Sequence, residues 1–561
     1  MIWRHWSTRM LLEELAGIDP ELYSDLEEII PSLRGDDFDP TELSSKPNLV
    51  KILMSFADST YFEKKEKMRR CLEGLPSLVQ SGLVRALRDN GYFVKGTSFE
   101  DTTENILKKR WNFRNIGFCR AFLEFFELPE HFLPPEKKKA PPFVDIYPLS
   151  ADNNLIINRP FKNLLDFQVQ VYSDAMKKMN VDRSRFVMQM PTGSGKTRTT
   201  MEVISNHLKS RPEGSVVIWM AHTEELCEQS FECFIEVWQH LADKPLKAVR
   251  FWGKQHLPPA YDKSMFIVGG FDKIRAALRK DPGAFNHLSD RIGLIVIDEA
   301  HRAVAPKTKE AIISLTGDNT RVIGLTATPG RADYDETEEM AEFFFESKVN
   351  IATDTGESEI KMLKRRKVLA EIDYIPIESP LDVQLTASQK RYLEEKFDFP
   401  PGLLKTVASS NVRNIEIMKK LLYSCQEIDK RILFFSCSVK HSRFIMALLQ
   451  YHGISAEHVD GKTSRARRED SIRRFKEGEI QVLCNYGVLT TGFDAPNTDE
   501  VFISRPTQSV VLYSQMVGRG LRGPTIGGTP RCRIVEVKDN ITGFAPDQTR
   551  VYHWFEEFWD N

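Results

Sequence analysis

The sequence predicts an α/β protein in which two tandem lobes, each built on a parallel β-sheet, follow a mostly helical N-terminal region. In the first lobe, apolar runs such as FVMQM, VVIWM and LIVIDEA alternate with helical patterns. A second alternating series begins with RILFFS at residue 431 and continues through VLCNYG, EVFIS and RIVEV. This alternation is typical of a parallel sheet with crossover helices. Near the N-terminus, stretches 49–57, 78–87 and 116–126 instead carry apolar residues at helical spacing.

The same patterns divide the 561 residues into six segments. The segment PPEKKKAPP combines prolines with lysines, which is typical of an extended connector. We expect a helical accessory domain at 1–133, this connector at 134–150, lobe 1 at 151–350, an inter-lobe connector at 351–375, lobe 2 at 376–540 and an aromatic tail at 541–561. The tail is expected to pack on lobe 2.

Composition limits the class of protein. With 41% hydrophobic and 28% charged residues the chain should be soluble and globular. Its formal net charge of -2 means that contact with nucleic acid would come from local basic patches. The eight cysteines include no C-x-x-C pair, which predicts neither a zinc site nor a disulfide framework. Because no run of about 18 apolar residues occurs, we expect a cytoplasmic protein without a membrane span.

The segment PTGSGKT at 191–197 is a candidate phosphate cradle, because it follows an apolar strand and precedes a helical run. Glycines let backbone N–H groups wrap phosphates at a helix N-terminus, while Lys196 neutralises the β- and γ-phosphates and the Thr197 hydroxyl binds Mg²⁺. The usual first glycine of this pattern is Met190 here. The residues expected to bind ATP are Thr192, Gly193, Ser194, Gly195, Lys196 and Thr197.

The segment LIVIDEAH is an apolar strand that ends in two carboxylates. We expect Asp298 to hold Mg²⁺ and Glu299 to orient or deprotonate the attacking water. The alternative is an ordinary strand followed by an acidic helix cap.

The ordered set GSGKT, DEAH, TAT, TTGFDAP and QMVGRGLR resembles the superfamily 2 helicases and translocases of the DEAD/DEAH type, over roughly residues 158–539. The resemblance implies two RecA-like lobes, and the family tolerates a residue other than glycine where Met190 stands. DEAHRA, LTATPGR, GFDAP and GRGLR resemble most the group that contains the type I and type III restriction motor subunits and related DNA repair and antiphage translocases.

The resemblance also implies roles for single residues. Gln168 would read adenine, although it could be a surface glutamine on a helix. Arg519 and Arg522 are three apart on a helix expected to begin near Tyr513, so they would share one face and act as arginine fingers, worth roughly 10³ to 10⁵ in rate. The residues implied to couple the lobes are His301, Thr326, Thr328 and Gln515. Those implied to face the nucleotide from lobe 2 are Gly492 and Asp494.

A nucleic-acid path is implied on one surface of both lobes. The residues implied are His222, Thr223, Gly269 and Gly270 in lobe 1, and Ser436, Lys462, Thr463 and Thr490 in lobe 2. Phosphate contacts of this type position a strand without reading its sequence.

Together these features predict a nucleic-acid-dependent ATPase, a helicase or translocase that uses ATP and Mg²⁺. We expect double-stranded DNA as its substrate, in genome defence or repair, with a separately encoded nuclease or a defence-complex subunit as a partner of the N-terminal domain. Two alternatives stay open: an RNA helicase, and a nucleotide-switched DNA-binding subunit without unwinding activity.

Overall fold

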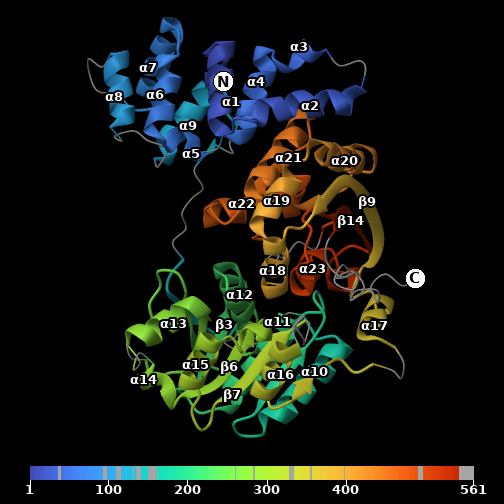
Figure 1. Cartoon of the computed structure of the whole chain (residues 1–561). Helices are drawn as coiled ribbons and strands as arrows, with labels where there is room; N and C mark the ends of the chain where they lie inside the picture. The colour runs from blue at the N-terminus through green and yellow to red at the C-terminus, as the bar shows by residue number, and fades with distance from the viewer. Residues whose placement is uncertain are drawn as a thin grey trace.

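The computed structural model of the chain describes residues 1–35, 39–57, 59–92, 98–108, 115–129, 132–133, 140–149, 160, 162–258, 261–281, 283, 285–327, 334–353, 357–396, 398–489 and 497–542. They form a helical N-terminal domain and two α/β lobes, with lobe 2 between the N-terminal domain and lobe 1 (Figure 1). The predicted fold class is confirmed. The predicted aromatic tail lies outside the described residues from position 543 onward.

The N-terminal domain is built from short helices around an aromatic core. Ser7 caps the first long helix by accepting a hydrogen bond from the backbone N–H of Met10, and Trp3 and Trp6 are fully buried. Its helices are η1 (Ile2–His5), α1 (Thr8–Ile18), α2 (Leu22–Arg34), α3 (Pro40–Leu43), α4 (Lys46–Phe56), α5 (Ser59–Glu63), α6 (Lys65–Glu73), α7 (Ser77–Asp89), α8 (Phe99–Leu107) and α9 (Ile116–Phe125). None of the helices that the structure describes in the chain combines the length and the apolar character needed to cross a bilayer.

Lobe 1 is organised around an eight-stranded sheet of order β1-β4-β5-β3-β6-β7-β2-β8, in which only the β1–β4 pair is antiparallel. Its strands are β1 (Phe143–Ile146), β2 (Arg185–Gln189), β3 (Val216–Ala221), β4 (Leu246–Phe251), β5 (Met265–Gly270), β6 (Ile292–Asp298), β7 (Arg321–Thr326) and β8 (Lys348–Val349). Strand β1 falls inside the segment predicted as a connector. It joins the sheet because Val144 and Ile146 alternate with polar Asp145 and pack on the apolar core.

Helices cover both faces of the lobe 1 sheet. One core contains Phe186 and Met188 and the other contains Val187, as the alternation of a strand requires. The helices on the first face are α10 (Asp166–Met179), α11 (Lys196–Ser210) and α12 (Glu224–Leu241). Those on the second are α13 (Phe271–Lys280), α14 (Asn286–Ser289), α15 (Pro306–Leu315) and α16 (Tyr334–Phe343).

Lobe 2 has a six-stranded sheet of order β11-β12-β10-β13-β14-β9, parallel throughout. Its strands are β9 (Glu371–Gln384), β10 (Ile432–Phe435), β11 (Ala456–Val459), β12 (Val482–Asn485), β13 (Glu500–Ile503) and β14 (Arg531–Thr542). Its helices are α17 (Glu359–Arg365), α18 (Ala387–Lys396), α19 (Pro401–Ala408), α20 (Asn411–Leu422), α21 (Val439–Tyr451), α22 (Arg465–Glu477) and α23 (Val510–Val517). Strand β9 starts within the segment predicted as the inter-lobe connector, so the sheet begins earlier than expected.

The N-terminal domain packs on the outer face of lobe 2, where α2 lies against α20 and α4 against α21 (Figure 1). One hydrophobic core contains buried residues of both parts, among them Trp6 of the N-terminal domain and Phe434 of β10. Polar contacts surround it. The Lys440 ammonium lies 2.7 Å from the Asp19 carboxylate, and the Lys51 ammonium donates to the carbonyl of Tyr451 at 2.6 Å. The N-terminal domain is therefore built onto lobe 2.

Candidate active site between the two lobes

The phosphate cradle predicted from the sequence lies between β2 and α11. Gly193 and Gly195 have φ angles of 85° and 87°, in the left-handed region that favours glycine. Gly195 is the N-cap of α11, so the helix starts at Lys196 with its free N–H groups facing the cleft. The loop is closed by Ser194, whose hydroxyl donates to the carbonyl of Pro191 at 2.7 Å. A helix N-terminus with a lysine at its first position suits a phosphate chain.

Gln168, predicted to read adenine, braces this loop. It lies in the first turn of α10 and is 5% exposed. Its side-chain oxygen accepts from the N–H of Leu165 at 2.9 Å, and its side-chain nitrogen donates to the carbonyl of Ser194 at 2.8 Å. A Cβ added to Gly195 would lie 2.3 Å from that nitrogen, so a side chain here would displace Gln168 as well as strain a φ of 87°. The position is not that of a surface glutamine, while its contact with adenine stays a prediction.

Two carboxylates end β6 beside the cradle. Asp298 is 6% exposed and accepts from the N–H of Glu299 at 3.1 Å. Glu299 has a φ of 59°, a left-handed conformation that is strained for a residue with a side chain and that recurs at functional sites. Burial, together with the charge of Glu299, raises the pKa of Asp298 to about 7. Burial also acts against the charge of Glu299, but Lys196 and His301 outweigh it and hold its pKa below the usual value.

The lobe 1 residues implied to couple the lobes lie near these carboxylates. His301 is buried, and its Nδ1 lies 3.5 Å from a carboxylate oxygen of Glu299. Thr326 ends β7, fully buried, and its carbonyl accepts from the N–H of Met190 at the start of the cradle at 3.1 Å. Thr328 lies outside the described residues.

Lobe 2 closes over this site with the end of α23. The Gln515 side-chain nitrogen donates to a carboxylate oxygen of Glu299 at 3.3 Å, across the cleft. Arg519 lies close enough for its charge to interact with Glu299, and its Nε donates to the carbonyl of Gln515 at 3.3 Å. A Cβ added to Gly193 would lie 3.9 Å from Cγ of Arg522. The structure thus brings the cradle and both predicted arginines together.

The arginines are not on a helix as predicted. Helix α23 runs from Val510 to Val517, and Arg519 lies in the turn after it. Arg522 follows that turn and forms an isolated antiparallel bridge with Leu369. The expectation of one helical face was wrong because glycines flank Arg519, and a Cβ at Gly520 would lie 2.2 Å from the sulfur of Cys532 on β14. Burial lowers the pKa of both Arg519 and Arg522 to about 10, which leaves them charged at neutral pH.

The lobe 1 residues implied to contact nucleic acid meet at one edge of the sheet. Gly269 and Gly270 end β5, which pairs in parallel with β3, and His222 and Thr223 directly follow β3. Thr223 caps α12, its hydroxyl accepting from the N–H of Leu226 at 3.2 Å. Burial and the nearby Arg302 charge lower the pKa of His222 to about 4, so its imidazole is neutral.

The corresponding residues of lobe 2 follow its strands. Ser436 is 2% exposed, and its hydroxyl donates to the carbonyl of Asn485 at 2.7 Å, so the group is engaged within the lobe. The Asp460 carboxylate accepts from the N–H groups of Lys462 and Thr463 at 2.7 and 2.8 Å and fixes their turn, with the Lys462 side chain exposed. The remaining predicted residues lie outside the described ones: Thr490, Gly492 and Asp494.

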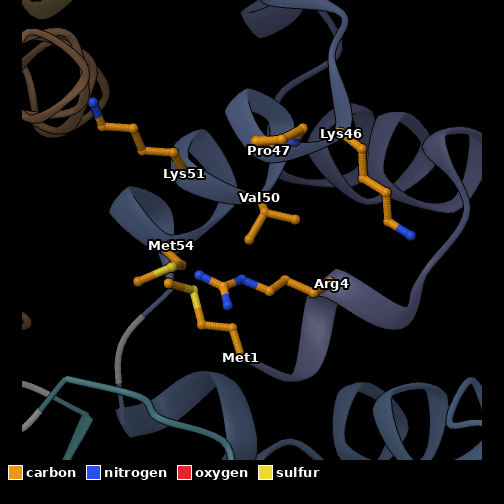
Figure 2. A pocket seen from close by; sticks show the side chains of 7 residues that line it. All are labelled: Met1, Arg4, Lys46, Pro47, Val50, Lys51 and Met54. Carbon is orange, nitrogen blue, oxygen red and sulfur yellow. The ribbon is translucent and has the colours of Figure 1, made fainter.

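Other features of the described residues do not add a second site. No group of three or more His, Cys, Asp or Glu side chains is placed to hold a metal ion in the described parts, and the eight cysteines are free. A cavity of about 310 Å³ in the N-terminal domain is lined by Met1, Arg4, Lys46, Pro47, Val50, Lys51 and Met54 (Figure 2). Of its three cationic side chains, only Arg4 points into the hollow.

Comparison with known proteins agrees with this arrangement. Residues 161–331 match the family model described as type III restriction enzyme, res subunit, and residues 413–523 match that of the helicase conserved C-terminal domain. The chain is 27% identical over 379 residues to the protein named ATP-dependent helicase IRC3 of Saccharomyces cerevisiae, which covers 64% of this chain and 49% of that protein.

Two further relatives extend the comparison. The chain is 26% identical over 426 residues to the mitochondrial ATP-dependent helicase irc3 of Schizosaccharomyces pombe, covering 72% of this chain and 63% of that one. It is 21% identical over 411 residues to a type I restriction enzyme EcoAI endonuclease subunit of Escherichia coli, covering 68% and 47%. The chain therefore spans about half to two thirds of the length of these relatives. With ordered motifs, two parallel-sheet lobes and both family models in agreement, the chain belongs to the superfamily 2 helicases, near the restriction motor subunits.

Proposed function

We propose that this chain is a nucleic-acid-dependent ATPase that couples ATP hydrolysis to movement on DNA. The observation that carries the proposal is the composite site. Glu299 of lobe 1 accepts a hydrogen bond from Gln515 of lobe 2 at 3.3 Å, beside the half-buried side chain of Arg519. A site completed only when two lobes meet can couple hydrolysis to a change in how the lobes grip a strand.

The residues present fit Mg-ATP. Burial of the Asp298 carboxylate beside Glu299 makes its charged form costly, and a divalent cation is a partner that would stabilise it. Thr197 and Asp298 would hold Mg²⁺, which supplies charge neutralisation on the phosphate oxygens. The backbone N–H groups from Gly193 to Lys196 would bind the phosphates, and Glu299 would orient the attacking water.

The lobe 2 arginines would then act late in the cycle. Arg519 and Arg522 have no role in a nucleotide held by lobe 1 alone, because both belong to lobe 2. When the lobes dock, their charges would stabilise the transferring phosphoryl group. When the lobes close, Gln515 would form its hydrogen bond to Glu299. His301, which lies beside Glu299, and Thr326, which lies beside the cradle, would couple that contact to the rest of lobe 1.

DNA is the proposed polymer because the chain resembles proteins described as restriction enzyme subunits. Restriction enzymes act on DNA, and these relatives are subunits, which supports a partner protein such as a nuclease. The phosphate contacts would come from His222, Thr223 and Lys462 and from the turns at Gly269 and Gly270.

The test is ATP turnover by the purified chain with duplex DNA, single-stranded DNA or RNA. Stimulation by duplex DNA supports the proposal, whereas stimulation by RNA alone would establish the RNA helicase instead. Lys196→Ala and Glu299→Gln should both abolish turnover. Triplex displacement then separates a translocase from a nucleotide-switched subunit, which would hydrolyse ATP without displacing the third strand.

A further inference from the structure

The lobes also meet at a second place, where α12 of lobe 1 faces α22 of lobe 2. A guanidinium nitrogen of Arg465 lies 2.8 Å from a carboxylate oxygen of Glu228, and Arg468 forms an ion pair with Glu225. We call these two ion pairs the α12–α22 pairs. They match in spacing, since the two acids and the two arginines are each three residues apart and so lie on one side of their helices.

The carboxylate of Glu228 is held rigidly on lobe 1. Arg250 of β4 donates to it through two nitrogens, the shorter contact being 2.7 Å, and its guanidinium carbon lies 3.8 Å from the ring centre of Phe231. Burial acts against the charge of Glu228, but Arg250 and Arg465 outweigh it and hold its pKa below the usual value. An ionised, fixed carboxylate therefore faces lobe 2.

Arg468 is fixed on lobe 2 in the same way. One of its guanidinium nitrogens donates to the backbone carbonyls of Asp460 and Thr463 at 3.0 and 3.2 Å, and its side chain is 10% exposed. The arginine thus presents its other nitrogen to Glu225. Because one partner of each pair, Glu228 or Arg468, is already held within its own lobe, less side-chain entropy is lost on pairing than in a typical exposed ion pair.

The α12–α22 pairs lie apart from the contacts around the cradle, where Gln515 meets Glu299 and Gly518 approaches Thr192. A further attachment away from the site limits rotation of one lobe on the other, and a displacement of 1 Å at reacting groups costs about 10²-fold in rate. We propose that the α12–α22 pairs are positioning contacts that fix lobe 2 so that Arg519 reaches the nucleotide. The inference rests on the proposed ATPase activity for its meaning, but its structural part can be tested without hydrolysis.

The first test compares Arg465→Ala with Arg473→Ala. Both arginines lie on α22 and are similarly exposed, 42% and 52%, but Arg473 pairs only with acids of lobe 2, Asp470, Glu477 and Glu479. Arg465→Ala should lower kcat for ATP about fivefold, with KM changed less than twofold, because closure rather than nucleotide binding is weakened. Arg473→Ala should behave as wild type. The wild-type rate should also fall with added salt, because salt screens the attraction between Arg465 and Glu228. The rate of Arg465→Ala should fall less, because this variant lacks that ion pair.

The second test measures closure directly by the radius of gyration in small-angle X-ray scattering. Arg465→Ala and Glu228→Gln should both increase it relative to Arg473→Ala, since each leaves lobe 2 less tightly held. The scattering measurement tests the α12–α22 pairs even if the wild type does not hydrolyse ATP. Failure of the proposed function and failure of this inference can therefore be distinguished.

Two outcomes would overturn the inference. One is an Arg465→Ala protein with wild-type kcat and radius of gyration. The other is an Arg465→Ala protein that binds DNA more weakly but keeps basal turnover and compactness, because the arginine would then be a phosphate contact.

Discussion

Gly518 offers a direct test of how closely the two lobes meet. It follows the last residue of α23, and a Cβ added to it would lie 2.3 Å from Cγ2 and 3.0 Å from Cβ of Thr192 in the phosphate cradle of lobe 1. The φ of Gly518 is −56°, which any residue adopts. The change Gly518→Ala therefore introduces no backbone strain and acts through the space between the lobes, apart from a contact 2.8 Å from the carbonyl of Ser514 in its own helix.

The size of the effect follows from these distances. Carbon atoms in contact lie about 3.5–4.0 Å apart, so the methyl group must displace the Thr192 side chain or lobe 2 by about 1.2 Å. Rotation of Thr192 would relieve the Cγ2 contact but not the Cβ contact, which still requires a shift of a few tenths of an ångström. At about 10²-fold per ångström of misplacement, we expect kcat to fall between about tenfold and a hundredfold. Binding of a fluorescent ATP analogue should change little, because the cradle itself is intact.

Controls isolate the steric cause. Gly402→Ala is the matched control, since a Cβ at Gly402 in α19 of lobe 2 meets nothing within 4 Å. Adding Thr192→Ser to Gly518→Ala removes Cγ2 and should restore part of kcat. Wild-type turnover by Gly518→Ala would refute the reasoning, because it would mean that the lobes do not dock at this spacing during hydrolysis.

The remaining predictions concern the cradle, a buried histidine and the N-terminal domain. Gly195→Ala should raise the Kd for ATP about five- to thirtyfold by titration calorimetry, because a φ of 87° costs an ordinary residue about 1–2 kcal/mol and the methyl group would displace Gln168. His441 is buried with a pKa of about 3, lowered by that burial, so the unfolded chain takes up its proton first as the pH falls below about 6.5. Between those two pKa values, His441 therefore lowers the free energy of unfolding by about 1.4 kcal/mol for each unit by which the pH falls. As the pH is lowered from about 7.5 to 5.5, the Tm of His441→Gln should fall less than that of the wild type. Lys440→Glu would place a like charge against Asp19, 2.7 Å away, so the N-terminal domain should become more sensitive to limited proteolysis.

Each of these predictions has an outcome that contradicts it. For the cradle, an unchanged Kd would show that the loop accepts a side chain at Gly195. For the histidine, parallel Tm curves for variant and wild type would exclude a contribution from His441. For the docked domain, Lys419→Glu is the control, because Lys419 pairs with Glu416 of its own helix. Equal proteolysis of the Lys440 and Lys419 variants would argue against the contact with Asp19.

The sequence predicted those parts of the site that lie next to regular elements. The cradle and the pair Asp298–Glu299 follow strands with clear apolar patterns, and parallel strands bring their carboxyl ends to one edge of a sheet. What it could not predict was the end of α23. The residues 510–522 have few local signals other than Gly518 and Gly520. The helix ends at Val517 with Gly518 as its C-cap, and the close approach of β14, where a Cβ at Gly520 would lie 2.2 Å from the sulfur of Cys532, depends on a strand distant in the sequence.

Contacts between distant segments were also beyond the sequence. The run of arginines in α22 suggests a basic surface, yet all five form ion pairs with carboxylates: Arg465, Arg467, Arg468, Arg473 and Arg474. Matching charges at a spacing of three in α12 and α22 were present in the sequence. Nothing in either helix, however, indicates that the two face each other, because that depends on how the lobes dock.

The N-terminal domain is attached to both lobes, by packing to lobe 2 and by the continuing chain to lobe 1. It shares a hydrophobic core with lobe 2, so it moves with that lobe when the cleft opens. Its chain nevertheless continues into β1 of lobe 1, whose strand pairing with β4 fixes Phe143. Between Leu133 and Phe143 the backbone can span at most about 35 Å when fully extended. This covalent connection therefore limits how far the cleft can open. Because the N-terminal domain is docked on lobe 2, the length of the connection also limits the distance between the arginines of lobe 2 and the phosphate cradle.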